Sequence, residues 1–224
     1  DTVNNDEYRL TPIRAKAATI EFYSSEEVNL ATFTAGDDNR WMVRITTEHT
    51  GFVWFLGFLV QDDITEPFQP RPNKVTLVAN DGLGSLKEVT PTDANGLVPR
   101  GYYSPIQYLY YCLQLTGLDL DIVLINSVRE VSNPNVPYMQ SCVLDAKTFQ
   151  AEIGAVEDAY TSIEKLLKEQ CILTQYNGQW WVVRLSELKG EAAHQAYVYR
   201  GGAFIGNRDA AMTRRIGFAE SMYL

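Results

Sequence analysis

The 224-residue sequence contains only two histidines and three cysteines. His49 and His194 lie outside any HExxH, HxH or CxxC context, so neither marks a metal site or a catalytic triad. The cysteines are odd in number and widely spaced, at Cys112, Cys142 and Cys171, which does not indicate a disulfide framework or a zinc site. We therefore predict no metal ion and no cofactor.

Basic charge and long apolar runs are also scarce. Lys and Arg total 19 against 28 Asp and Glu, and a net charge of −9 provides no positive field for binding phosphate backbones. Specific nucleic-acid binding is therefore not expected. No apolar run approaches the about 20 residues of a membrane helix, so no membrane span is expected. The chain starts at Asp1 with neither methionine nor an apolar leader, which indicates a processed chain or a fragment.

Apolar residues make up 46% of the chain and aromatic residues 12%, which is ample for a packed core. Residues 17–23, 41–45 and 75–79 alternate apolar and polar side chains, as half-buried strands do. The apolar run 51–60 is interpreted as a buried strand, and the proline-rich stretch 61–73 as an extended connection. Turn residues at hairpin spacing separate these segments, so this part of the chain is predicted to form an antiparallel β-barrel or sheet.

A helix is predicted over 104–116. Ser104 followed by proline is a helix start, the apolar residues recur at helical spacing, and Gly117 stands where a left-handed cap is common. The stretch 118–125 then alternates and predicts a strand, with two aspartates, Asp119 and Asp121, on one face.

A second helix and a hairpin are predicted further along. Residues 161–164 match a capping box, and an apolar stripe follows it. Strands are predicted over 172–176 and 179–185, joined by Asn177 and Gly178, because an Asn-Gly pair between apolar strands is a strong hairpin signal.

These patterns predict an α+β fold in three parts. A β-rich, barrel-like domain is expected over residues 1–88, and a mixed helix-and-strand domain over 89–188. Residues 189–224 form a tail, which fits the start of a truncated third domain.

Two stretches of the chain carry recognisable sets of residues. The first set is Trp54, Gly57, Asp62, Asp63, Pro70, Pro72, Val75, Leu77, Ala79, Asp81, Gly82, Leu83, Leu86 and Lys87. The second set is Tyr160, Leu166, Leu167, Gln175, Gly178, Trp180, Trp181 and Arg184. Together they resemble tail-tip or baseplate-hub proteins of phages and prophages, of the type found in Bacteroidetes genomes. The two stretches span roughly half of the chain, and neither is a catalytic motif.

The resemblance implies a non-catalytic structural component of the virion tail, made in the bacterial cytoplasm, whose barrel is similar to tail-tube subunits. By the same resemblance its partners are copies of itself, as a homotrimer in the full-length protein, together with tail-tube and other tail-tip proteins. The family-matching positions that we single out as structural or interface residues are Trp54, Asp62, Asp63, Asp81, Gly82 and Trp180.

Two other functions are open on the sequence alone. Tryptophans on strands could stack sugars in a secreted carbohydrate-binding module, and because Trp180 and Trp181 point to opposite faces of one strand, at least one is predicted to lie at a surface. An Asp-based hydrolase would need two carboxylates that converge. Asp62 and Asp63, being adjacent, diverge in a strand.

Overall fold

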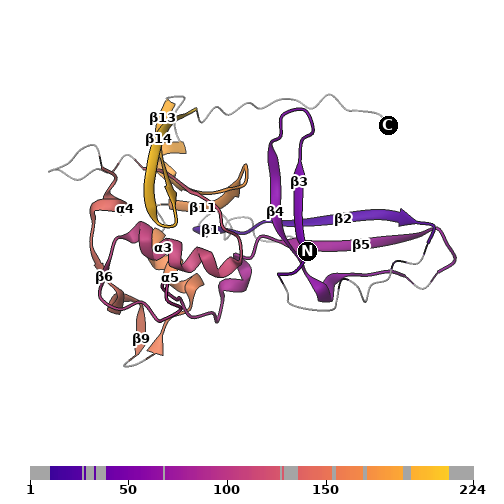
Figure 1. Cartoon of the computed structure of the whole chain (residues 1–224), viewed down its shortest axis with the longest axis horizontal. Coiled ribbons are helices and arrows are strands. Elements are labelled where there is room, and N and C mark those ends of the chain that lie inside the picture. Colours follow the sequence, from indigo (N-terminus) through magenta and orange to yellow (C-terminus); the bar gives the residue numbers. More distant parts are fainter. Residues whose placement is uncertain are drawn as a thin grey trace.

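The computed structural model describes residues 11–26, 28, 33, 39–67, 69–126, 128, 136–152, 155–168, 171–188 and 193–211. A six-stranded sheet and its covering helices form a body, and a four-stranded antiparallel sheet extends away from that body (Figure 1). The α+β class predicted from the sequence is confirmed, as is an antiparallel sheet in the first part of the chain.

The six-stranded sheet has the strand order β1-β11-β12-β7-β13-β14. Its strands are β1 (Ile13–Arg14), β11 (Cys171–Tyr176), β12 (Gln179–Arg184), β7 (Ile122–Ile125), β13 (Ala193–Arg200) and β14 (Ala203–Ala211). The central strand β7 runs parallel to β12 and antiparallel to β13, and all its residues are buried. Helices α3 (Pro105–Leu113) and α5 (Ala159–Leu167) pack on the face that carries Leu124, and a smaller apolar cluster forms around Val123 on the other face.

The start and the end of helix α3 follow from its flanking residues. The Ser104 Oγ accepts a hydrogen bond from the Gln107 N–H at 3.3 Å, which satisfies one of the amide groups left free at a helix start. The chain continues as the 3-10 turn η3 (Gln114–Thr116) and stops at Gly117, whose φ of 78° is the left-handed conformation of a cap. The predicted helix over 104–116 is confirmed.

Helix α5 starts earlier than predicted. The capping box expected at 161–164 is wrong, because the N-cap is Asp158, whose carboxylate accepts a hydrogen bond from the Thr161 N–H at 2.7 Å. Aspartate caps a helix as well as serine or threonine does, and it lies three residues upstream of the position that the pattern favoured.

Strand β7 is shorter than predicted. A strand was expected over 118–125, but β7 begins at Ile122, so Asp119 and Asp121 precede it and do not share a strand face. The Asp121 carbonyl accepts from the Trp180 N–H at 2.9 Å, and pairing with β12 begins there. An aspartate is costly to bury in a central strand, which explains why the strand starts after it.

Several short elements surround the helices and the sheets. They are η1 (Gln61–Asp63), η2 (Gly84–Leu86), β6 (Tyr102–Tyr103), α4 (Tyr138–Ser141), β8 (Leu144–Asp145), η4 (Ala146–Phe149), β9 (Gln150–Glu152), β10 (Ala155–Val156) and η5 (Leu185–Leu188). Strand β6 pairs with β8, and β9 with β10.

The four-stranded sheet has the order β2-β5-β4-β3, with every neighbouring pair antiparallel. Its strands are β2 (Ala17–Ser24), β5 (Asn73–Asn80), β4 (Val53–Leu59) and β3 (Met42–Thr46). Strands β4 and β5 pair only at Phe58 with Asn80 and Leu59 with Ala79. Beyond this short junction, the β3–β4 hairpin and the β2–β5 ribbon leave in different directions (Figure 1). The described strands thus form an open sheet.

Part of the stretch 189–224 differs from the expected tail. Strands β13 and β14 form a hairpin in the six-stranded sheet, where Tyr197 and Tyr199 are buried. Tyr197, Val198 and Tyr199 are residue types that favour strands, a signal that the expected tail did not take into account. Strand β1 also joins that sheet from the far end of the chain. Residues 212–224 lie outside the described part, and the division into domains stays a prediction.

Candidate assembly surface

Strand β2 leaves one edge of the protruding sheet without a partner among the described strands. The Asp81 N–H donates to the Lys16 carbonyl at 3.1 Å, so Lys16 and every second residue after it direct their backbone groups toward β5. The intervening residues direct theirs outward. The outward row is Ala17, Thr19, Glu21 and Tyr23, and we call it the β2 edge.

Strand β3 leaves the opposite edge without a described partner. The Leu59 N–H donates to the Trp41 carbonyl at 3.0 Å, which fixes the alternation in β3 in the same way. Met42, Arg44 and Thr46 therefore direct their backbone groups away from β4, and we call this row the β3 edge. Within the described part of the chain, the sheet presents two rows of backbone donors and acceptors that no strand pairs with, a form that readily pairs with another strand.

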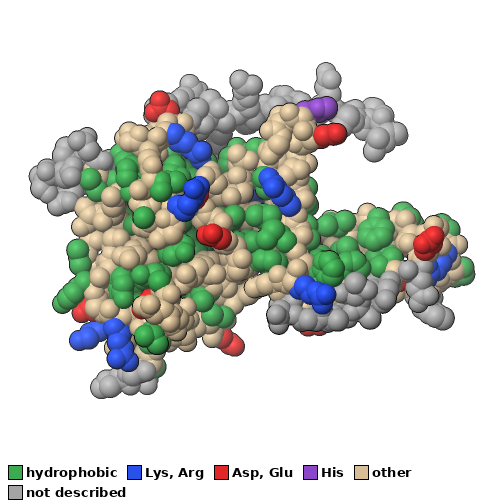
Figure 2. Space-filling model, viewed as in Figure 1, with side chains coloured by type: hydrophobic (Ala, Val, Ile, Leu, Met, Phe, Trp, Pro, Cys, Tyr) green, Lys and Arg blue, Asp and Glu red, His purple; other side chains and the backbone are tan. Residues whose placement is uncertain are grey.

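Large apolar side chains accompany both edges. Tyr23 is 76% exposed and Met42 58%, while Phe22 and Ile45 on the other face of the sheet are 38% and 36% exposed. Long flat edges with exposed apolar residues are unfavourable in a free monomer, since they promote association. Figure 2 shows apolar side chains gathered over the β2–β5 ribbon.

The two faces of the sheet are covered to different extents. One face carries Phe55, Leu59 and Ala79, which form a small apolar cluster with neighbours that include Trp41. The other face contributes Phe58 to the core of the body. The sheet is therefore held by apolar contacts at its base, while its edges lie clear of the described elements.

Gln175 of strand β11 joins the β3–β4 hairpin to the body. Its side chain is 1% exposed, its Oε1 accepts from the Leu56 N–H at 2.8 Å, and its Nε2 donates to the Leu56 carbonyl at 2.7 Å. Beside it, the Asn177 Oδ1 accepts from the Val53 N–H at 3.0 Å. These side chains replace a neighbouring strand for β4, and they fix the hairpin's direction relative to the body. Sequence analysis placed Asn177 in a turn, but nothing in the sequence indicates these contacts.

Asp81 and Gly82 lie at the junction between the sheet and the body. The fully buried Asp81 carboxylate accepts from the Lys16 N–H at 2.8 Å and from the Leu83 N–H at 3.1 Å. Burial raises the pKa of this carboxyl group to about 6, although both hydrogen bonds act in the opposite direction. Gly82 has a φ of 78°, and a Cβ there would lie 2.9 Å from Thr116. Asp81 and Gly82 thus form a tightly packed joint.

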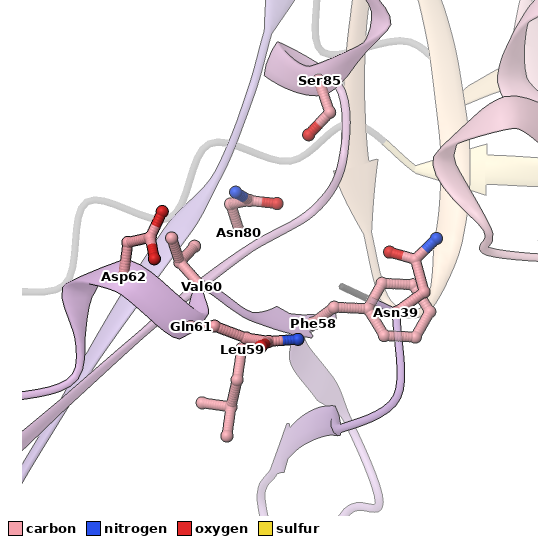
Figure 3. A pocket seen from close by; sticks show the side chains of 8 residues that line it. All are labelled: Asn39, Phe58, Leu59, Val60, Gln61, Asp62, Asn80 and Ser85. Carbon is pink, nitrogen blue, oxygen red and sulfur yellow. The ribbon is translucent and has the colours of Figure 1, made fainter. Parts of the chain in front are cut away.

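Asp62 lines a hollow of about 200 Å³ beside this joint. Figure 3 shows the Asp62, Asn80 and Ser85 side chains around this hollow, together with Asn39 and the Phe58 ring. The lining is mostly polar, and the adjacent Asp63 is exposed. The structure brings Asp62 and Asp63 together in a 3-10 turn at the surface and does not bring them to Asp81.

Trp54 belongs to a row of aromatic side chains on the surface. It is 61% exposed, and its ring lies 4.8 Å from Phe52, which is 5.1 Å from Tyr176, itself 5.3 Å from Trp181, as measured between ring centroids. We call these four residues the aromatic stripe. Arg208 of β14 lies over the Trp181 ring. The stripe links the protruding hairpin to strands β11 and β12 of the six-stranded sheet.

Trp180 and Trp181 occupy opposite faces of β12, as predicted. Trp180 is fully buried in the core of the body, while Trp181 is partly exposed in the aromatic stripe. The expectation that at least one of the pair lies at a surface is confirmed. Trp180 and Trp54, both singled out from the sequence, lie in different parts of the molecule and share no site.

The remaining acidic and histidine candidates are placed apart. Arg200 donates two hydrogen bonds to the Asp121 carboxylate, at 2.7 and 2.8 Å. His194 pairs with Glu187 at 3.1 Å. Within the described residues, no group of three or more His, Cys, Asp or Glu side chains is arranged to hold a metal ion. None of the helices in the described part of the chain has the length and apolar character needed to cross a membrane.

Comparison with known proteins adds little to these features. No family model matches the chain, and no curated protein matches it in sequence. Among solved structures, the chain is similar to a prophage tail protein. That structure is the 43 kDa tail protein of prophage MuSo2 from Shewanella oneidensis, with a TM-score of 0.38 and 10% sequence identity. The match covers 76% of this chain but 44% of that protein, so the chain spans less than half of its length.

Proposed function

We propose that this protein is a structural subunit of a phage or prophage tail, at the tail tip or the baseplate hub. In that role it associates with copies of itself and with neighbouring tail proteins and performs no catalysis. The observation that carries the proposal is the protruding four-stranded sheet, with exposed apolar side chains and two edges that have no partner among the described strands. The sequence resemblance to hub proteins, which includes Gly57 and Asp81 at the base of this sheet, supports the same role.

The role follows from the energetics of the sheet. A neighbouring subunit that adds a strand satisfies the free backbone groups and removes the exposed apolar side chains from water. The contacts of Gln175 and the buried Asp81 joint hold the sheet in one direction relative to the body. A rigidly oriented edge favours one geometry of assembly, and the trimer that the resemblance implies is the proposed stoichiometry.

The first test is the state of association of the purified chain. Light scattering on a size-exclusion column, over a range of loading concentrations, is expected to show oligomers that dissociate on dilution. Negative-stain electron microscopy is expected to show closed particles. A chain that stays monomeric at every soluble concentration, and that binds no tail-tube or tail-tip protein in pull-down, would contradict the proposal.

A second test concerns DNA. A tail channel must let DNA pass without binding it, and the net charge of −9 repels phosphate groups. We expect no shift of duplex DNA in a gel-mobility assay at moderate salt. Tight binding of duplex DNA in this assay would contradict a role in lining the tail channel.

The aromatic stripe favours one second candidate, a carbohydrate-binding module. Exposed Trp54 and Tyr176 provide rings on which sugars can stack. Glycan-dependent quenching of tryptophan fluorescence that is lost in Trp54→Ala would support this candidate. The aspartates singled out for the Asp-based hydrolase do not support it. Arg200 holds the Asp121 carboxylate, and Asp62 lies in a surface turn with Asp63.

A further inference from the structure

We infer that the β3 edge of one copy pairs antiparallel with the β2 edge of the next copy, in the register that places Arg44 opposite Glu21. This inference rests on the proposed self-association and specifies its contact. The partner is a second copy of this chain because its two free edges complement each other in strand direction, in the face that each side chain occupies, and in charge.

The strand directions allow continuation of the sheet from copy to copy. Neighbouring strands alternate in direction across β2-β5-β4-β3, so β2 and β3 run opposite ways. A second copy that continues the sheet therefore brings its β2 antiparallel to the β3 of the first.

The faces also match. Ala17 pairs with Asn80, Asn80 with Phe58, and Phe58 with Met42, so Ala17 and Met42 lie on one face of the sheet. Alternation places Glu21 on the face of Ala17, and Arg44 on the face of Met42. The outward backbone groups of both edges therefore belong to residues of the same face. Hydrogen-bonded residue pairs can therefore form between two copies while every side chain stays on its own face of the sheet.

One register pairs all five residues of β3 with side chains of matching character. Its pairs are Tyr23 with Met42, Phe22 with Val43, Glu21 with Arg44, Ile20 with Ile45, and Thr19 with Thr46. Apolar residues meet apolar residues on one face, and opposite charges meet on the other. The pairs also cover the exposed side chains of both edges.

Neighbouring registers are poorer. A shift of two residues places Arg44 opposite Thr19 or Tyr23 and leaves Glu21 opposite Met42 or Thr46. A shift of one residue puts each side chain on the wrong face. Glu21 also contacts Lys74 of its own copy, at 2.7 Å through Oε1. In the inferred contact the Glu21 carboxylate thus lies between two cations, Lys74 and the next copy's arginine at position 44.

This contact joins different edges of two copies, so it is heterologous. A heterologous contact closes into a ring when its rotation divides the circle and otherwise continues as a filament. The free edges would then be absent from a closed ring, which agrees with the proposed role in a tubular tail.

The test combines charge reversal with cross-linking in the full chain. Glu21→Arg and Arg44→Glu are each expected to raise the dissociation constant of self-association at least about tenfold, because each places like charges opposite one another. The double variant Glu21→Arg with Arg44→Glu is expected to restore association. Glu48→Arg, at an exposed position outside the register, is the matched control and is expected to associate as the wild type does. Circular dichroism confirms that each variant folds.

Cross-linking checks the register itself. In a background with Cys142→Ser, since Cys112 and Cys171 are buried, a Glu21→Cys chain mixed with an Arg44→Cys chain should form a disulfide-linked heterodimer. The mixture of Glu21→Cys with Glu48→Cys should not. Association that persists unchanged in both charge-reversal variants, without the heterodimer, overturns the register and leaves the proposed function standing. A wild-type chain that does not self-associate at all overturns the inferred contact. It overturns the proposed function as well if it also binds no tail-tube or tail-tip protein.

Discussion

Asp81 shows at the scale of a single residue how the joint between sheet and body is held. Its carboxylate accepts hydrogen bonds from two backbone N–H groups, that of Lys16 before β2 and that of Leu83 after β5. Asp81 is one of the family-matching positions singled out from the sequence, and strand β5 ends just before it, at Asn80. Its complete burial was not predictable, because the groups that cover it come from distant parts of the chain.

The buried Asp81 makes stability depend on pH. The pKa of this carboxyl group is 3.8 ordinarily and about 6 in the folded chain. At about 1.4 kcal/mol per pKa unit, the shift changes the free energy of unfolding by about 3 kcal/mol between low and high pH. The folded state holds the proton more tightly, so this group's contribution to the free energy of unfolding is fully present below about pH 4 and is lost as pH rises to about 6. Urea unfolding over this range is expected to show this loss in the wild type but not in Asp81→Asn. A wild-type-minus-variant difference that stays constant with pH would rule the effect out.

Gln175 gives a second prediction for a single side chain. Gln175→Ala leaves the Leu56 N–H and carbonyl without their partners in a partly buried position. Each unsatisfied group costs about 1–3 kcal/mol, so we expect the free energy of unfolding to fall by about 3 kcal/mol in urea titration. Gln69→Ala, at an exposed position, is the matched control, with an expected change within about 0.5 kcal/mol. Equal effects of the two variants would contradict the role of Gln175.

At the scale of elements, the most constrained contact is the short pairing of β4 with β5. Gly57 lies in β4 where a Cβ would stand 2.1 Å from the Asn80 carbonyl oxygen. The β3–β4 hairpin can therefore reach the β2–β5 ribbon only with glycine at this position. The predicted strands and the Asn-Gly hairpin are confirmed as elements, with Asn177 and Gly178 at φ of 49° and 67°. The sequence did not predict that the β3–β4 hairpin and the β2–β5 ribbon diverge. An alternating pattern marks a strand but does not indicate how many of its residues pair with a neighbouring strand.

Gly57→Ala is expected to separate the two parts of the sheet. Overpacking against backbone costs about 1–3 kcal/mol, and the two residue pairs that join β4 to β5 should loosen. Thermal unfolding measures the loss. Hydrogen exchange at Val60, whose N–H donates to the Val78 carbonyl at 2.8 Å, and at Asn80 measures the loosening. Gly84→Ala, where a Cβ would meet nothing within 4 Å, is the control and should change neither quantity. A variant that keeps wild-type exchange at both amides would show that the joint tolerates a side chain.

At the scale of the whole molecule, a compact body carries a protruding sheet whose outer strands keep apolar side chains exposed. The net charge of −9 keeps copies apart unless specific contacts overcome the repulsion. The proposed association overcomes this repulsion through edges whose charges are complementary, the edge with Glu21 and the edge with Arg44. The proposed role in a phage tail belongs to this scale, because it depends on how copies meet and not on a site within one copy.

Hydrogen exchange followed over concentration should locate the contact. The outward amides of Thr19, Glu21 and Arg44 are expected to exchange rapidly in dilute protein and to gain protection as oligomers form. Amides of the central strand β7 should stay protected at every concentration, because they are buried within one copy. Protection that appears instead along β14 would assign self-association to the six-stranded sheet.

The sequence by itself determined the local elements of this protein. The Ser-Pro start of α3, the alternation in β2, β3 and β5, and the Asn-Gly hairpin depend on a few adjacent residues, so they could be predicted without the fold. Only the tertiary structure decided which edges stay free, where β13 and β14 join, and what buries Asp81. Each of these depends on contacts between residues far apart in the chain, and a pattern of neighbouring residues does not contain them.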